Sequence, residues 1–236
     1  QDIDRNIIIT NNKGGYSVPI GEWIVFKILE IYKDNRYFFE YKLNKSWKIN
    51  TDVQEISDKK VLFLGTGTIP LEAQKRLKAF VKEISGINTK GRLVDGFDKC
   101  YAIDELSTYI GDYDTIVICL PHTKATHNLV NKELIDKMKD DAVLINIARG
   151  AIIHEESLIN ALDKGKFLGV ALDVFDKEPL KADSKLFNFD RTYLSPHNSW
   201  ISQKRNERRF DLIYKNMKAF IDNEELKNIV DLSKGY

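Results

Sequence analysis

Five short apolar runs, separated by helical segments, constrain the fold of this chain more than any other feature. They are Val61–Leu64, Ile84–Ile87, Thr115–Leu120, Val143–Asn146 and Leu168–Val174. Segments with a helical pattern lie between or after them, at 73–80, 103–110, 132–139 and 155–164. Strands that are apolar at nearly every position are buried on both faces, which is typical of parallel sheets covered by helices on each side. The pattern predicts an α/β fold with a doubly wound parallel sheet.

Composition excludes several classes of partner. The 236 residues include 36 Lys or Arg and 35 Asp or Glu, so there is no basic excess for binding nucleic acid. Cys100 and Cys119 form neither a disulfide framework nor a metal-ligand pattern, so no metal site is expected. The apolar run Trp23–Ile31 is interrupted by Lys27 and Glu30, so no membrane span is expected. We therefore expect a cytoplasmic protein with reduced thiols.

The segments that flank the alternating pattern carry signals of their own. Residues 6–10 form a β-branched run that predicts a short strand, followed by a loop at 11–15. A buried helix is expected to have Ser17 as its N-cap and Pro19 in its first turn, and to continue to Ile31. A long helix of mixed charge is expected at about 202–223.

A glycine-rich turn directly follows the first apolar run. Residues 65–70 read G-T-G-T-I-P and match the first two glycines of the pattern G-x-G-x-x-G. The first glycine makes the tight turn, and the second lets backbone N–H groups approach a pyrophosphate at a helix N-terminus. Proline at the third position is tolerated because the first turn of a helix has no intrahelical N–H bond to lose. The turn predicts a Rossmann-type dinucleotide site.

Three polar residues in the second half of the chain suit hydride-transfer chemistry on a 2-oxo acid. They are, in chain order, Arg149, Glu178 and His197. An arginine can hold a substrate carboxylate in a bidentate pair and polarise the carbonyl oxygen. A histidine can move the proton, and a carboxylate can fix the tautomer of that histidine. Each residue alone would fit a turn or loop equally well, but together with the glycine turn they predict an oxidoreductase.

The chain resembles the D-isomer-specific 2-hydroxyacid dehydrogenase family from about residue 7 to residue 231. The carriers of the resemblance are Tyr16–Trp23, the glycine turn, Leu120–Thr123, Asn146–Gly150, Leu172–Pro179 and Leu194–Asn198. The resemblance implies a two-domain enzyme that transfers a hydride between a nicotinamide cofactor and a small D-2-hydroxy or 2-oxo acid. Residues 18–200 would form its dinucleotide-binding domain. Residues 1–17 and 201–236 would be the remnant of a flavodoxin-like substrate domain whose first lobe is absent from the sequence.

The resemblance also implies the cofactor contacts. Family members that use NAD carry an acid where this chain has Asn88, and Lys90 and Arg92 follow here. NADP is therefore favoured over NAD, because nothing repels a 2′-phosphate and two cations can bind it. Asp173 is expected on the nicotinamide side. The expected cofactor-binding residues are Gly65, Thr66, Gly67, Thr68, Ile69, Asn88, Thr89, Lys90, Arg92, Leu120, Pro121, Thr126, Ile147, Ala148, Arg149, Asp173 and His197.

By the same resemblance, catalysis is assigned to Arg149, Glu178 and His197. The expected substrate-binding residues are Asn11, Gly14, Gly15, Tyr16, Arg149 and Trp200. The loop at 11–16 would hold the substrate carboxylate through backbone N–H groups, and Trp200 would border the substrate. His122 and His127 match no catalytic position and are expected at the surface or at the edge of the cofactor.

An aromatic cluster predicts an interface. Its members are Tyr37, Phe38, Phe39, Tyr41 and Trp47, which lie among charged residues. A patch of this size is more often an interface than bare surface, and the family pairs through this segment, so a homodimer is expected. The alternative is that these rings pack against the absent lobe.

Several alternatives for function remain open at this point. A formate dehydrogenase-like enzyme shares the fold, but that branch carries glutamine where this chain has Glu178. A dinucleotide-sensing binding protein can retain all three catalytic residues. Phosphoglycerate dehydrogenase, which acts in serine synthesis, is a further substrate assignment within the family, although no basic residue in the available loops points clearly at a substrate phosphate.

Overall fold

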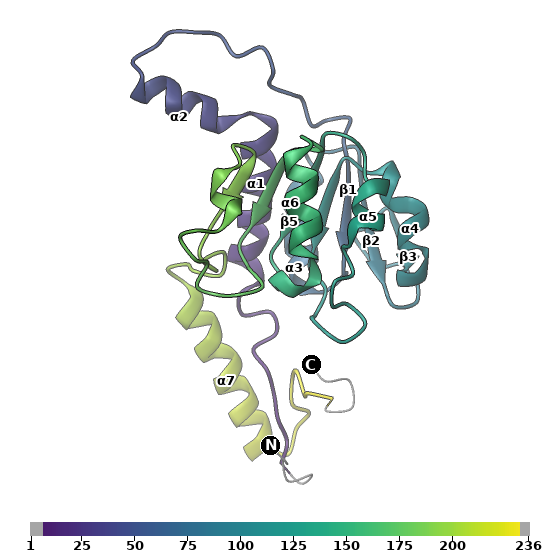
Figure 1. Cartoon of the computed structure of the whole chain (residues 1–236). Helices are drawn as coiled ribbons and strands as arrows, with labels where there is room; N and C mark the ends of the chain where they lie inside the picture. Colours follow the sequence, from purple (N-terminus) through teal and green to yellow (C-terminus); the bar gives the residue numbers. More distant parts are fainter. Residues whose placement is uncertain (1–6, 232–236) are drawn as a thin grey trace.

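The computed structural model describes residues 7–231, and the described residues form a seven-stranded sheet (Figure 1). The strands are β1 (Lys60–Leu64), β2 (Glu83–Asn88), β3 (Lys99–Ala102), β4 (Thr115–Ile118), β5 (Ala142–Asn146), β6 (Phe167–Leu172) and β7 (Thr192–Leu194). All strand pairs are parallel, in the order β3-β2-β1-β4-β5-β6-β7. The predicted doubly wound parallel sheet is confirmed.

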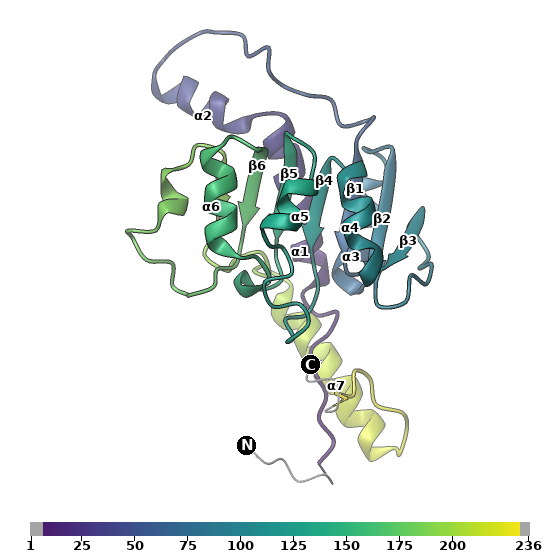
Figure 2. The ribbon, with the colours of Figure 1, turned by 45° about the vertical axis from the view of Figure 1, so that its right-hand side comes forward.

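Helices cover both faces of the sheet (Figures 1 and 2). On one face lie α1 (Ser17–Tyr32) and α3 (Thr68–Leu77), and on the other lie α4 (Leu106–Tyr109), α5 (Lys132–Lys137) and α6 (Glu155–Asp163). The side chains of β1 alternate between the two layers: Val61 packs toward α1 and α3, whereas Leu62 packs toward α4–α6. Both are fully buried, because each face of the strand has its own helical layer.

The carboxyl ends of the strands meet at one edge of the sheet. There the strand order reverses between β1 and β4, since β2 and β3 lie to one side of β1 and β5–β7 lie beyond β4. Ligands of open α/β sheets bind outside the carboxyl ends of strands at such a switch point. The glycine turn follows β1, and the segments that begin at 119, 147 and 173 follow β4, β5 and β6. This edge therefore collects most of the predicted site residues.

Two segments outside the sheet lie side by side near the chain ends. Thr10 forms an isolated antiparallel bridge with Ile229, and the Asn11 N–H donates to the Asn228 carbonyl at 3.0 Å. The helix α7 (Arg205–Ile221) precedes this contact and has no buried residue (Figure 1). The predicted strand at 6–10 is wrong for residues 7–9, which belong to no strand although the Ile9 carbonyl accepts from the Val230 N–H at 2.8 Å, and residue 6 lies outside the described residues. The division into a domain at 18–200 and a remnant stays a prediction.

Other expectations needed correction. Ser17 is the first residue of α1 and not its cap, because its hydroxyl hydrogen-bonds the Thr68 hydroxyl at 2.8 Å. The helix expected at 73–80 begins at Thr68, directly after the glycine turn, and ends at Leu77. The segment 103–110 is divided into the 3₁₀ turn η1 (Ile103–Glu105), α4 and η2 (Ile110–Asp112). The edge strands β3 and β7 were not expected. In the described part of the chain, no helix is long and apolar enough to cross a membrane.

Candidate active site

The glycine turn has the geometry that close approach to a phosphate needs. Gly65 has φ +109, and a Cβ there would lie 3.0 Å from the Cys119 carbonyl oxygen, so a side chain would be strained on both counts. A Cβ at Gly67 would meet nothing within 4 Å, so its backbone faces open space. Immediately afterwards α3 begins at Thr68 and presents its N-terminus to that space. Free N–H groups at this end suit a pyrophosphate.

Asn88 organises the loop after β2. Its Oδ1 accepts from the N–H groups of Lys90 and Arg92 at 3.2 and 3.1 Å, and its Nδ2 donates to the Arg92 carbonyl at 2.7 Å. The asparagine amide therefore holds the turn that carries both cations, whose side chains are exposed. An aspartate at this position could accept the same two bonds but could not donate the third. The loop therefore presents two exposed cations beside the cleft, and their contact with a 2′-phosphate stays a prediction.

A cleft of ≈ 840 Å³ runs along this edge of the sheet. Its lining includes these predicted residues: Gly65, Thr66, Gly67, Ile69, Asn88, Thr89, Leu120, Pro121, Ile147, Ala148, Arg149 and Asn11. The remaining predicted cofactor residues, Thr68, Lys90, Arg92, Thr126, Asp173 and His197, are not part of this lining. The Thr126 hydroxyl donates to the Pro121 carbonyl at 2.7 Å, so it braces the loop after β4. A nicotinamide dinucleotide fits the cleft by its size and by the open glycine turn.

The cleft also contains residues that the sequence did not single out for the site. They are Lys13, Cys119 and the segment of Asn228, Ile229 and Asp231, and the cleft lining also includes His122, which was expected at the surface or at the edge of the cofactor. Burial raises the pKa of the Cys119 thiol, so this cysteine lines the cleft as a neutral group. No periodicity could reveal the C-terminal segment, because it reaches the cleft through pairing with residues more than two hundred positions earlier.

Arg149 projects from a turn that a buried asparagine holds. Asn146, fully buried at the end of β5, accepts from the Ala148 N–H at 3.0 Å and donates to the Arg149 carbonyl at 2.9 Å. The exposed Arg149 side chain lines the cleft, and its Nη1 donates to the Ala148 carbonyl at 2.6 Å. Gly150 then begins η3 (Gly150–Ile152) with its Cα pressed against the backbone of Phe175. This contact joins the arginine turn to the loop that carries Glu178.

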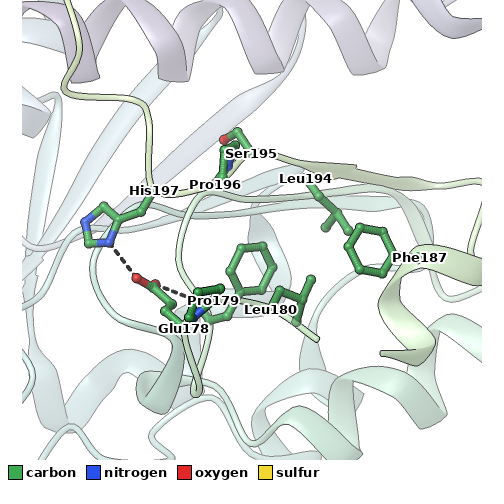
Figure 3. A pocket seen from close by; sticks show the side chains of 9 residues that line it. Glu178, Pro179, Leu180, Phe187, Leu194, Ser195, Pro196 and His197 are labelled. Carbon is green, nitrogen blue, oxygen red and sulfur yellow. Dashed lines mark hydrogen bonds and ion pairs between the residues drawn. The ribbon is translucent and has the colours of Figure 1, made fainter. Parts of the chain in front are cut away.

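His197 and Glu178 form a direct pair (Figure 3). The Nδ1 of His197 lies 2.8 Å from Oε2 of Glu178, and Oε1 accepts from the Phe175 N–H at 3.0 Å. Burial acts to raise the pKa of Glu178, but the hydrogen bonds from His197 and Phe175, with the charge of Arg149, hold this pKa below its ordinary value. An ionised carboxylate on Nδ1 leaves Nε2 of the histidine available for proton transfer.

Asp173 clamps the loop that carries His197. Its fully buried carboxylate accepts from the Ser195 hydroxyl at 2.6 Å and from the N–H groups of Asn198 and Ser199 at 2.7 and 3.0 Å. Its backbone carbonyl accepts from the His197 N–H at 2.8 Å. His197 itself has φ +51, which is uncommon for a residue with a Cβ and is held here by these bonds. A contact of Asp173 with the nicotinamide stays a prediction.

Trp200 and the loop at 11–16 border the histidine from the other side. The Trp200 Nε1–H donates to the His197 carbonyl at 2.8 Å, and the Tyr16 ring packs edge-on against Trp200 with centroids 5.3 Å apart. In the loop, the N–H groups of Asn11 and Gly15 already donate to the carbonyls of Asn228 and Asn12. Of the predicted backbone donors, this leaves the N–H groups of Gly14 and Tyr16. In this loop conformation, these two groups would make any backbone contact with the substrate carboxylate.

An apolar cavity of ≈ 510 Å³ lies beside the His197–Glu178 pair (Figure 3). Besides the pair and Ser195, its walls are Phe175, Pro179, Leu180, Phe187, Leu194 and Pro196. In Figure 3 the imidazole points away from these apolar side chains. The apolar cavity therefore lies behind the pair, whereas the glycine turn and Arg149 line the larger cleft.

Together, a Rossmann cleft and an arginine, a histidine and its carboxylate define the class of a nicotinamide-dependent oxidoreductase. The chain belongs to the D-isomer specific 2-hydroxyacid dehydrogenase family, since the family model for the NAD binding domain matches residues 25–199. The predicted family, the predicted enzyme class and a nicotinamide dinucleotide as cofactor are thereby confirmed.

Known proteins of this family resemble the chain in sequence and in fold. The glyoxylate reductase of Thermofilum pendens is 30% identical over 226 residues, which cover 93% of this chain and 67% of that protein. A D-isomer specific 2-hydroxyacid dehydrogenase from Xanthobacter autotrophicus, solved in complex with NADPH and MES, superposes with a TM-score of 0.87 at 25% identity and covers 100% of this chain and 97% of that one. A family member from Aeromonas salmonicida gives a TM-score of 0.87 at 30% identity, over 97% and 73% of the two chains. The chain spans about two thirds of the length of the curated relatives it matches.

Proposed function

We propose that this protein reduces small 2-oxo acids to D-2-hydroxy acids, with His197 as the proton donor. The observation that carries the proposal is the 2.8 Å contact between His197 and Glu178, within the electrostatic reach of Arg149. A bound nicotinamide dinucleotide supplies the hydride. The protein's own residues must bind the acid, orient its carbonyl and deliver one proton.

Each residue has a separate task in this proposal. Arg149 forms a two-bonded pair with the substrate carboxylate and polarises the carbonyl oxygen, which positions C2. His197 gives its Nε2 proton to that oxygen, while the Glu178 carboxylate on Nδ1 stabilises the charged imidazole before transfer. Asp173 keeps the histidine loop in place through Ser195.

NADPH is the proposed cofactor. Support comes from the Asn88 turn, which holds Lys90 and Arg92 exposed and contains no carboxylate to repel a 2′-phosphate. The relative from Xanthobacter autotrophicus was solved with NADPH, which favours the same choice here. Calorimetric titration with NADPH and NADH tests it. Equal or tighter binding of NADH would contradict the proposal.

Glyoxylate and hydroxypyruvate are the first substrates to assay. The Thermofilum pendens relative is a glyoxylate reductase, and an Arabidopsis thaliana relative at 29% identity is a glyoxylate/hydroxypyruvate reductase. NADPH consumption should be followed at 340 nm with these two acids, branched 2-oxo acids and 3-phosphohydroxypyruvate. Turnover of the phosphorylated acid alone would favour the phosphoglycerate dehydrogenase assignment. Tight NADPH binding without turnover of any acid would favour a dinucleotide-sensing protein.

A cytoplasmic homodimer completes the proposal. The helix α2 (Asn35–Leu43) and the segment after it have no buried apolar residue as far as Val53, and Phe39 and Trp47 are 63% and 92% exposed. Figure 1 shows α2 lying outside the helical layers that cover the sheet. Aromatic surface of this kind is stabilised when it is covered by a second copy. Both cysteines are free thiols, which suits a reducing compartment.

A further inference from the structure

Two histidines outside the catalytic set share a hydrogen bond at the rim of the cleft. Nε2 of His122 lies 3.2 Å from Nδ1 of His127, and the ring centroids are 5.4 Å apart. The loop between them is braced, because the Thr123 and Thr126 hydroxyls and N–H groups bond one another across a single turn. Both imidazoles are exposed to solvent, and His122 also lines the cleft.

A bonded imidazole pair takes up protons one at a time. When both rings are neutral, one N–H lies between the two nitrogens. Adding one proton converts this contact into a charge-assisted bond between an imidazolium and an imidazole, which is stronger. A second proton would place like charges at the same distance and is disfavoured. The side-chain amide of Asn128 lies 3.4 Å from Nε2 of His127. Rotating this amide by half a turn exchanges its N–H donor for its oxygen acceptor, so it can hydrogen-bond His127 whether or not Nε2 carries a proton.

The pair lies across the cleft from the Asn88 loop. The strands β2, β1 and β4 are neighbours in the sheet, and the Asn88 loop and the His122 loop follow the outer two. Two strand spacings separate these loops by about 10 Å. Both loops line the same cleft, with the glycine turn between them. The pyrophosphate of a dinucleotide bound in the cleft, and the 2′-phosphate of NADP, would interact electrostatically with the His122–His127 pair.

We propose that His122 and His127 are a proton-linked anion-recognition element, so that binding of the dinucleotide increases the protonation of the pair. The inference rests on the proposed function in that a dinucleotide occupies the cleft. By linkage, a ligand that favours proton uptake binds more tightly when the pair is already protonated. Dinucleotide affinity therefore rises as the pH falls through the range in which histidine titrates.

Other charged groups also lie around the pair. They are Lys124 on the same loop, Lys90 and Arg92 after β2, and Lys13, Arg149 and Asp231 around the cleft. One unit charge about 10 Å from a phosphate, at an effective dielectric between that of a protein surface and water, changes affinity about 2- to 10-fold. The expected rise in NADH affinity from pH 8 to pH 6 is of this size.

The experiment is calorimetric titration of the whole protein with NADH and with NADPH, in two buffers of different ionisation enthalpy at pH 7. The difference in apparent enthalpy gives the number of protons taken up. The double variant His122→Gln/His127→Gln is compared with wild type, so that titration of the 2′-phosphate itself cancels in the difference. Lys124→Gln is the matched control, since it removes a charge from the same loop and leaves the pair intact. Wild type and Lys124→Gln should take up a fraction of a proton more than the double variant, at most about half a proton.

Equal proton uptake by wild type and the double variant, with binding retained in both, would overturn this inference and leave the proposed function intact. If the double variant fails to fold, NADH affinity at pH 6 and pH 8 is compared between wild type and the single variant His127→Gln, because NADH has no phosphate that titrates there and both proteins keep His197. A rise of a few-fold at pH 6 in wild type alone supports the pair, and a flat wild-type affinity or an equal rise in both proteins overturns it. A wild-type protein that binds neither dinucleotide would overturn both proposals.

Discussion

Gly150→Ala should damage the active site by separating the loops of Arg149 and Glu178. A Cβ at this position would lie 1.9 Å from the carbonyl carbon of Phe175 and 2.1 Å from the Asp176 nitrogen. These are backbone atoms, which cannot rotate away as a side chain could. Ordinary contact begins at 3.4 Å, so the two loops must separate by about 1.5 Å, the difference between 3.4 and 1.9 Å. Overpacking of this kind costs about 1–3 kcal/mol of stability.

The larger effect should be on turnover. A misplacement of about 1 Å in a reacting group can cost about 10²-fold in rate, so kcat/KM of Gly150→Ala should fall by about that factor. Steady-state reduction of glyoxylate, normalised to the folded fraction by circular dichroism, measures it. Gly165→Ala is the matched control, because Gly165 has φ +68 with open space around it. That control should lose about 1 kcal/mol of stability through backbone strain and keep its kcat/KM. Equal kcat/KM for both variants would refute the steric argument.

Three further predictions follow from single features. Arg149→Lys should raise KM for the 2-oxo acid more than it lowers kcat, because an ammonium cannot reproduce the two-bonded pair; an unchanged KM in initial-rate assays would place the carboxylate elsewhere. Glu178 has a depressed pKa in the folded protein, so its contribution to stability is present above its ordinary value of 4.5 and is lost as the pH falls below that value. The stability difference between wild type and Glu178→Gln in urea titrations should therefore shrink from about pH 5 toward pH 3, and a difference that grows over this interval would reverse the sign. Trp47→Ser should shift the protein from dimer to monomer at micromolar concentration, as measured by light scattering. A wild-type protein that is itself monomeric would contradict pairing through the aromatic cluster.

The sheet was predictable where burial on both faces leaves a continuous apolar run. The four strands at the centre of the sheet and β6 were found for this reason. The edge strands β3 and β7 are only half-buried, so their short runs Lys99–Ala102 and Thr192–Leu194 carry no such signal. Ser17 was misassigned as a cap because its hydroxyl partner, Thr68, lies 51 residues away and no local pattern can show it.

The candidate site was predictable where a residue type is itself the signal. The order of Arg149, Glu178 and His197, together with the resemblance to the family, predicted the His197–Glu178 pair, which lies at 2.8 Å. The clamp of Asp173 on the histidine loop was not predictable, because its bonds span 22 to 26 residues and use backbone N–H groups. Lys13 and Asn228 entered the cleft through the pairing of the two chain ends, which depends on tertiary structure alone.

The central claim is that His197 donates the proton and that Glu178 supports it. The pH profile of single-turnover reduction of glyoxylate by NADPH, for wild type, Glu178→Gln and His197→Gln, tests it most directly. His197→Gln should reduce the rate by about 10² to 10⁴ and leave dinucleotide affinity nearly unchanged. Glu178→Gln should be milder and should move the upper pH limit of reduction to lower pH, because a neutral amide no longer favours the protonated imidazole. A fully active His197→Gln, or a Glu178→Gln profile that superposes on that of wild type, would contradict the assignment.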